Sequence, residues 1–272
     1  MLYDFCDTNQ QPLSAYLPSE ALCYNGKYID EEIRLFRTLY VSGRESFSAD
    51  IAETVLESID GSVFLQRRLL PRTITVGYQI AARSAHELMA AYNHLNHLMR
   101  AAQVKVSFAD EPDKYYIGTC RTVGSPEPGR LTVKAEMEIY CPDPCKYAVD
   151  TVTVSPDSNG LFTIEYGGTF PAYPIFEAEF SGNANQIVFT AENAVVSAGD
   201  VESESAVFIA DDTVRIDCGT AKIYINDNDA PSVGDIANQY EQMMLEFGTN
   251  IITAAYTGAA PTFTMTYREA WL

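Results

Sequence analysis

The sequence reads VKVSFADEPDKYYIG from Val104 to Gly118. Residues 104–108 and 114–118 are rich in β-branched and aromatic side chains, which favour strands. Between them, Pro112 lacks the N–H that a strand ladder requires, and aspartate suits a tight reversal. We therefore predict a β-hairpin whose turn spans residues 109–113 and whose carboxylates point into water.

An amphipathic helix is predicted just before this hairpin. Ser84 followed three positions later by Glu87 forms a capping-box pattern, in which each side chain accepts a backbone N–H of the first turn. Apolar residues then recur every three or four positions, at Leu88, Tyr92, Leu95 and Met99. This spacing places them on one buried stripe.

The pattern changes near residue 148, which predicts a first domain over residues 1–148 and a second over residues 149–272. Residues 131–140 alternate between apolar and polar, as in a half-buried antiparallel strand. Short apolar segments separated by turn residues follow at 161–166, 175–180, 186–190, 206–210, 214–218, 223–225, 251–256 and 262–267. We expect a mainly β, β-rich α+β chain: a β-sandwich-like first domain with one α-helix, then a jelly-roll β-sandwich. A helical turn is expected within residues 235–247.

Composition excludes several classes of protein. The 272 residues are 47% hydrophobic and 20% charged, as in an ordinary soluble protein. No apolar run reaches the roughly 18 residues needed to cross a bilayer, and no leader pattern opens the chain, so we expect synthesis in the cytoplasm without membrane insertion. The net charge of −19, from 18 basic and 37 acidic residues, argues against nucleic-acid binding. It fits either a solvated acidic surface or an acidic channel wall that repels phosphates.

The potential metal ligands do not form a recognisable site. The six cysteines are Cys6, Cys23, Cys120, Cys141, Cys145 and Cys218. Only Cys141 and Cys145 are close, and their spacing is wider than that of common zinc knuckles, so we expect free or structural thiols. His94 and His97 share a helix face beside the apolar stripe, where solvation is the simpler interpretation. Residues 226–231, with Asp227 and Asp229, resemble a cadherin calcium linker but lack its companion motifs, which favours a polar hairpin loop. No cofactor is expected.

Catalytic motifs are also missing. The candidate acids and bases are Asp110, Glu111, Asp113, His86, and the pairs Glu31/Glu32 and Asp211/Asp212. None lies in a nucleophile elbow, a phosphate-binding glycine loop or a zinc-protease motif. We predict that the protein is not an enzyme.

The acidic proline turn and its tyrosine pair resemble those of the distal tail proteins of long-tailed bacteriophages, the siphophages. The residues that carry this resemblance are Asp110, Glu111, Pro112, Asp113, Tyr115, Tyr116, Pro144 and Tyr147. Further similar segments occur in the same order at residues 61–63, 70–76, 140–147, 167–169, 174–176, 214–217, 248–252 and 266–272. The resemblance therefore extends over nearly the whole chain.

The resemblance implies a structural protein of the virion tail tip or baseplate, of phage or prophage origin. Its first domain would form a homo-hexameric ring between the tail (tube) protein and a central tail-lysin or fibre hub protein. In that family a hairpin reaches across the neighbouring subunit; our candidate arm is residues 34–55, with Arg37, Tyr40, Arg44 and Phe47.

The second domain would be a galectin-like sandwich to which receptor-binding or baseplate proteins dock. A carbohydrate-binding adhesin that recognises host cell-wall polysaccharide is the alternative. Sugar platforms usually use tryptophan, and the chain has one, Trp271, in the expected last strand.

Overall fold

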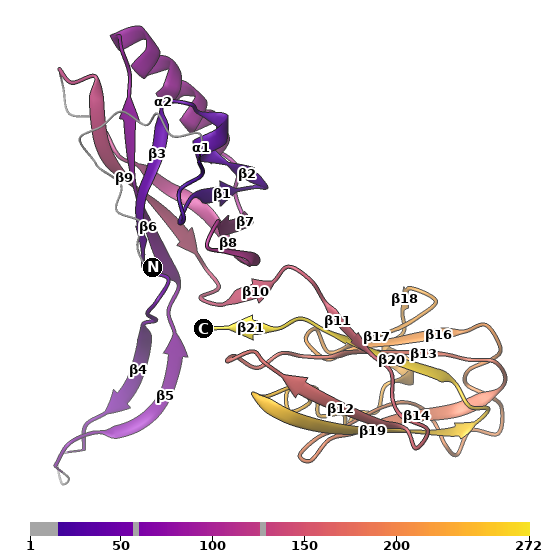
Figure 1. Ribbon diagram of the computed structural model, residues 1–272. Helices are drawn as coiled ribbons and strands as arrows, with labels where there is room; N and C mark the ends of the chain where they lie inside the picture. The colour runs from indigo at the N-terminus through magenta and orange to yellow at the C-terminus, as the bar shows by residue number, and fades with distance from the viewer. Residues whose placement is uncertain (1–15, 57–59, 126–128) are drawn as a thin grey trace. The chain divides into compact units, whose positions relative to one another are not determined.

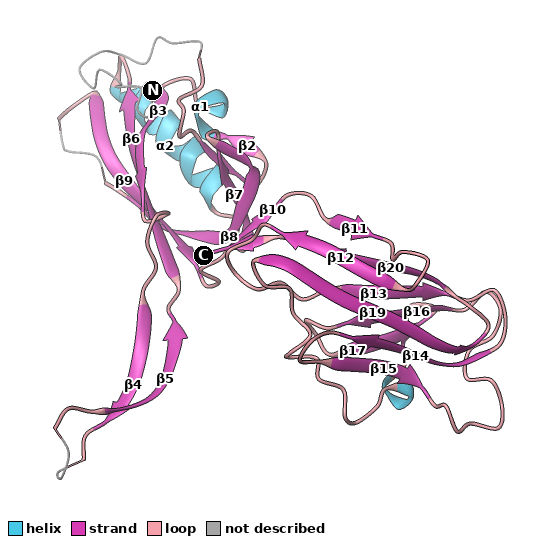
Figure 2. Cartoon of the chain, turned by 60° about the horizontal axis from the view of Figure 1, so that its bottom comes forward, coloured by secondary structure: helices cyan, strands magenta, loops and turns pink. Residues whose placement is uncertain are grey.

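The computed structural model describes residues 16–56, 60–125 and 129–272 and is mainly β, which confirms the predicted fold class (Figures 1 and 2). Two compact units divide the chain. The first comprises Met1–Lys146 with Leu272, and the second comprises Tyr147–Trp271. Each unit has its own hydrophobic core.

The first unit is built on one antiparallel sheet, in the order β2-β1-β7-β8-β9-β6-β3. Its strands are β1 (Leu22–Tyr24), β2 (Lys27–Tyr28), β3 (Phe36–Ser42), β6 (Arg72–Ala81), β7 (Val104–Phe108), β8 (Glu111–Val123) and β9 (Thr132–Cys141). A single turn of helix, α1 (Ile29–Glu32), connects β2 to β3. In β9 the predicted alternation places Val133, Met137 and Ile139 in the core.

Helix α2 (Ala85–Met99) carries the predicted apolar stripe. Leu88, Tyr92, Leu95 and Met99 are all buried in the core of the first unit. Ser84 is the N-cap, and its hydroxyl accepts the backbone N–H of Glu87 at 3.2 Å. The Glu87 carboxylate accepts the N–H of Arg83 at 2.8 Å rather than that of Ser84, so the capping box closes one residue earlier than predicted.

The reversal between β7 and β8 is tighter than predicted. Only Ala109 and Asp110 lie outside the strands, and Phe108 pairs with Glu111. Pro112 therefore lies inside β8 and not in the turn. The register shifts between Val106 and Phe108, so Pro112 falls where the ladder is interrupted and its missing N–H costs no strand hydrogen bond.

A two-stranded hairpin, here called the arm, is formed by β4 (Ala49–Thr54) and β5 (Val63–Leu69). The two strands pair only with each other, and Figure 1 shows the hairpin projecting from the end of the first unit's sheet. The chain enters the arm from β3 and returns from it directly into β6.

The second unit is an antiparallel β-sandwich. One sheet has the order β11-β20-β13-β16-β17-β18 and the other β12-β19-β14-β15. The strands of these two sheets are β11 (Val152–Val154), β12 (Leu161–Tyr166), β13 (Ile175–Glu179), β14 (Ala184–Thr190), β15 (Val195–Gly199), β16 (Thr213–Asp217), β17 (Lys222–Ile225), β18 (Asn228–Asp229), β19 (Gly248–Gly258) and β20 (Thr262–Tyr267). Two short strands that belong to neither sheet, β10 (Lys146–Ala148) and β21 (Ala270–Trp271), pair with each other. Phe176 of one sheet stacks on Phe189 of the other, with 4.0 Å between ring centroids.

Three local predictions for this unit need correction. Residues 206–210 form no strand, because Phe208 makes only an isolated bridge to Ala184 while its ring is buried. Strands β11, β15 and β18 were not predicted. Residues 235–247 adopt turns, and the nearby helical element is the short 3-10 helix η1 (Pro231–Val233).

Among the helices in the described parts of the chain, none combines the length and the apolar character needed to span a membrane.

Candidate assembly site: the arm and its root

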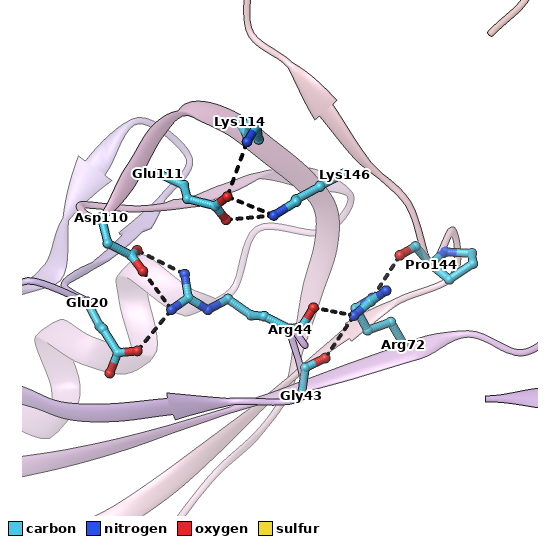
Figure 3. Close-up of polar contacts among 9 residues, drawn as sticks. All are labelled: Glu20, Gly43, Arg44, Arg72, Asp110, Glu111, Lys114, Pro144 and Lys146. Carbon is cyan, nitrogen blue, oxygen red and sulfur yellow. Dashed lines mark hydrogen bonds and ion pairs between the residues drawn. The ribbon is translucent and has the colours of Figure 1, made fainter. Parts of the chain in front are cut away.

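Arg72 fixes the place where the arm leaves the sheet. It is buried at the start of β6, directly after the arm. Its Nε donates to the carbonyl oxygen of Pro144 at 2.7 Å, and its Nη1 donates to those of Gly43 and Arg44 at 3.1 and 2.7 Å (Figure 3). The same Nη1 also donates to the carbonyl oxygen of Ser46 at 2.8 Å. One side chain therefore ties the segment that enters the arm to the segment that follows β9.

Arg44 binds the same region to the acidic turn. Its guanidinium donates to both carboxylate oxygens of Asp110, at 2.9 and 2.8 Å, and to Glu20 at 2.9 Å (Figure 3). It also lies over the ring of Phe108, 4.5 Å from the centroid. Burial by itself lowers the pKa of Arg44, but the hydrogen bonds and negative charge of Asp110 and Glu20 outweigh it and raise the pKa. Arg44 is therefore a fixed cation.

Glu111 forms the second ion-pair cluster. Its carboxylate accepts Lys146 Nζ at 2.8 and 2.7 Å and Lys114 Nζ at 3.2 Å (Figure 3). Burial raises the pKa of Glu111, but Lys146 and Lys114 outweigh that effect and lower it.

The prediction that the carboxylates of the turn point into water is thus wrong for Glu111, which is partly buried between two lysines. Asp110 is exposed as predicted, but it also binds Arg44. The prediction holds for Asp113, which is exposed.

The aromatic residues of the motif lie beside these clusters. Tyr116 is buried, and the guanidinium of Arg72 lies 5.6 Å from its ring centroid. Burial raises the pKa of Tyr116 to about 12, so it stays neutral. Tyr115 is also buried and contacts Lys105. Tyr147, by contrast, lies in β10 at the start of the second unit.

The motif residues thus divide by position. Asp110, Glu111, Tyr116 and Pro144 surround the root of the arm, which we define as Gly43–Ser46 with Arg72. Pro112 and Asp113 are exposed on β8.

The part of the arm next to its root has one mainly apolar side. Because directly opposed residues of an antiparallel pair project to the same face, the pairs Ala49–Leu69 and Ile51–Arg67 share one face, and Asp50–Arg68 and Ala52–Gln66 share the other. Phe47 joins the first face, since its ring lies 5.0 Å from the Arg67 guanidinium. We call Phe47, Ala49, Ile51, Arg67 and Leu69 the apolar arm face.

This face is not covered by the chain's own described residues. Ile51 is 57% exposed and Phe47 is 51% exposed. Nearer the tip, Phe64 and Leu65 are 63% and 60% exposed. A free two-stranded hairpin is only marginally stable, and large exposed apolar patches mark interaction surfaces. The arm therefore presents apolar side chains that the described parts of the chain leave exposed.

The predicted arm residues need correction. Arg37 and Tyr40 lie in β3, within the sheet, where Tyr40 packs over Gly77 and donates its hydroxyl proton to Glu136. Arg44 belongs to the root, and only Phe47 lies on the apolar arm face. The observed hairpin pairs residues 49–54 with residues 63–69, whereas the predicted arm covered residues 34–55. The apolar run at residues 63–65 is the sequence signal for its second strand.

The other candidate sites are not assembled in the described parts of the chain. His94 and His97 are exposed on α2. Asn226 and Asp227, with positive φ angles of 51° and 63°, form the two-residue turn between β17 and β18. No group of three or more His, Cys, Asp or Glu side chains suited to a metal occurs in residues 16–56, 60–125 and 129–272.

The cysteines in the described parts of the chain are free thiols, and Cys6 lies outside those parts. Burial raises the pKa of Cys141, Cys145 and Cys218 to about 12 each, which makes these thiols poor nucleophiles and metal ligands.

Comparison with known proteins identifies the family. Residues 26–141 match the family model for the phage tail protein RIFT-related domain, and residues 167–271 match that for the siphovirus-type tail component, C-terminal domain. The distal tail protein of Bacillus phage SPP1 is 23% identical over 256 residues, which cover 92% of this chain and 95% of that protein. The chain belongs to the distal tail protein family of siphophages.

A solved relative shows the same fold. The crystal structure of the SPP1 Dit protein, described as a paradigm of the hub adsorption apparatus of phages that infect Gram-positive bacteria, matches with a TM-score of 0.77. The match covers 93% of this chain and 99% of that chain at 19% identity. The expected relation to the distal tail proteins is thus confirmed.

Proposed function

We propose that six copies of this chain close into a ring at the tip of a phage tail, and that the arm of each copy binds its neighbour. The observation that carries the proposal is the uncovered apolar arm face on a hairpin whose root is clamped by Arg44 and Arg72. A fixed root aims the arm, and its apolar side gains stability only when another surface buries it. In a closed ring this contact is repeated at every subunit boundary.

The ring would join the tail tube protein to a central lysin or fibre hub protein. The second unit would hold receptor-binding or baseplate proteins, consistent with its separate core. The role is structural and non-catalytic. Family membership and the hub described for the SPP1 relative support a location at the virion tail tip after assembly in the host cytoplasm.

Two matched substitutions test the arm. Ile51→Asp places a carboxylate on the apolar arm face, whereas Gln66→Asp adds the same charge on the opposite face. We expect the wild-type protein and Gln66→Asp to form hexamers, alone or with tail tube protein, in sedimentation velocity and electron microscopy. We expect Ile51→Asp to remain monomeric with an unchanged circular dichroism spectrum. A wild-type chain that stays monomeric with tube protein, or two variants that assemble equally well, would contradict the proposal.

A further inference from the structure

A row of polar side chains crosses the outer face of the six-stranded sheet in the second unit. Glu177 of β13 is opposite Thr264 of β20 on one side and Arg215 of β16 on the other, and Arg215 is opposite Tyr224 of β17. The alternate positions of these strands, such as Phe176 and Val214, are buried in the core. The row therefore faces away from the core.

Arg215 is held in place but its hydrogen-bonding capacity is unused. Its guanidinium lies 4.4 Å from the centroid of the Tyr224 ring. Its Nε is buried and has no hydrogen-bond partner, and no described residue forms an ion pair with it, although Glu177 is its cross-strand neighbour. Stacking thus fixes the side chain, and the two Nη groups, which have no partner among the described residues, are the donors left for a ligand.

Two residues of this row, Glu177 and Arg215, line a hollow beside the β17–β18 turn. The other residues that line it are Thr213, Asn226 and Asp227. The turn is rigid, because Asn226 Oδ1 accepts the Thr213 N–H at 2.9 Å and its Nδ2 donates to Asp212 at 2.8 Å. Within the described parts of the chain, the carboxylates of Glu177 and Asp227 have no hydrogen-bond or ion-pair partner. The hollow therefore presents unused donors and acceptors on a fixed frame.

We propose that this hollow binds a neutral sugar unit of a glycan. A cationic ligand would meet the guanidinium of Arg215, and an anionic one would meet two carboxylates, so the charges favour a neutral ligand. Sugar hydroxyls both donate and accept: they donate to Glu177 and Asp227 and accept from Arg215. The Thr264 hydroxyl lies one strand away and extends the polar row for a longer chain of sugars. This site does not depend on ring formation.

The test is saturation-transfer NMR on the full-length protein with a panel of sugars. The neutral probes are glucose, galactose, rhamnose and N-acetylglucosamine; the charged probes are glucosamine and glucuronate. Arg215→Met keeps the stem over Tyr224 and removes the guanidinium, while Glu177→Gln keeps the shape and removes the charge. The matched control is Glu165→Gln, at an outward glutamate on the other sheet that accepts the Thr249 hydroxyl.

We expect at least one neutral sugar to bind the wild-type protein and Glu165→Gln equally. Arg215→Met and Glu177→Gln should each weaken that binding by about tenfold or more, as expected for losing a charged hydrogen bond. No transfer to any neutral sugar, tighter binding of a charged probe, or unchanged binding in both folded variants would overturn the site. Because none of these outcomes depends on oligomeric state, they are separate from the test of the arm.

Discussion

Arg44 links the root of the arm to the acidic turn. Its side chain is only 10% exposed and pairs with Asp110 and Glu20. Arg44→Met removes these pairs and leaves two carboxylates facing an apolar stem, so we expect the first unit to lose about 2 kcal/mol of unfolding free energy. The measurement is urea unfolding followed by far-UV circular dichroism.

A matched substitution controls for that measurement. Lys27→Met removes an exposed ion pair with Glu32, at 3.6 Å, and should change the unfolding free energy by less than about 0.5 kcal/mol. If Arg44→Met and Lys27→Met lowered the unfolding free energy equally, the ion pairs of Arg44 would contribute no more than an exposed surface pair.

Glu111 makes the root sensitive to acid. Lys146 and Lys114, against the opposing effect of burial, hold its folded-state pKa below the ordinary value of 4.5. A lowered folded pKa stabilises the fold above the unfolded pKa, and this contribution is lost as the pH falls through the folded pKa. In Glu111→Gln that contribution is absent at every pH. We therefore expect the stability difference between wild type and Glu111→Gln to shrink between about pH 5 and about pH 3. A difference that stays constant across this range would contradict the assignment.

At the scale of the elements, helix α2 depends on its N-cap. Ser84→Ala removes the acceptor for the Glu87 N–H, and we expect a loss of about 1 kcal/mol in urea unfolding. Ser84→Asp keeps an acceptor and adds a negative charge at the helix N-terminus, so it should retain wild-type stability. If both variants were equally destabilised, the loss would not come from the hydrogen bond to the Glu87 N–H, because Ser84→Asp keeps an acceptor for it.

The sequence predicts best those elements in which buried side chains recur at regular spacing along the chain. The stripe of α2 and the alternation of β9 need only the spacing of side chains, and both are observed. The position of Pro112 inside β8 was not predictable in this way, because a register shift depends on the partner strand. Strand β15 depends on a distant residue: the Asn238 side chain accepts the N–H of Ser197 at 2.7 Å and donates to its carbonyl at 2.8 Å, which closes a sheet edge.

The assembly site shows a further limit of local patterns. The sequence marks Asp110 and Glu111 as turn formers, but their partners Arg44 and Lys146 are 66 and 35 positions away. A strand with exposed apolar residues on both faces, such as β5, looks the same in sequence as a core strand. The structure is needed to show that β4 and β5 pair with each other and with no further strand, which leaves these residues exposed.

In the proposed ring of whole molecules, charge repulsion and apolar contact would oppose each other. Each copy carries a net charge of −19, so neighbouring copies repel, whereas burial of the apolar arm face is not screened by salt. We therefore expect raising NaCl from about 0.05 M to about 0.5 M to strengthen ring formation, because screening shortens the range of the repulsion. Sedimentation velocity at matched protein concentrations measures the shift. Ile51→Asp, which adds charge to the arm face, should remain unassembled at both salt concentrations. Rings that dissociate at high salt would instead show that ion pairs, made by Arg67 and Arg68 of the arm, hold the copies together.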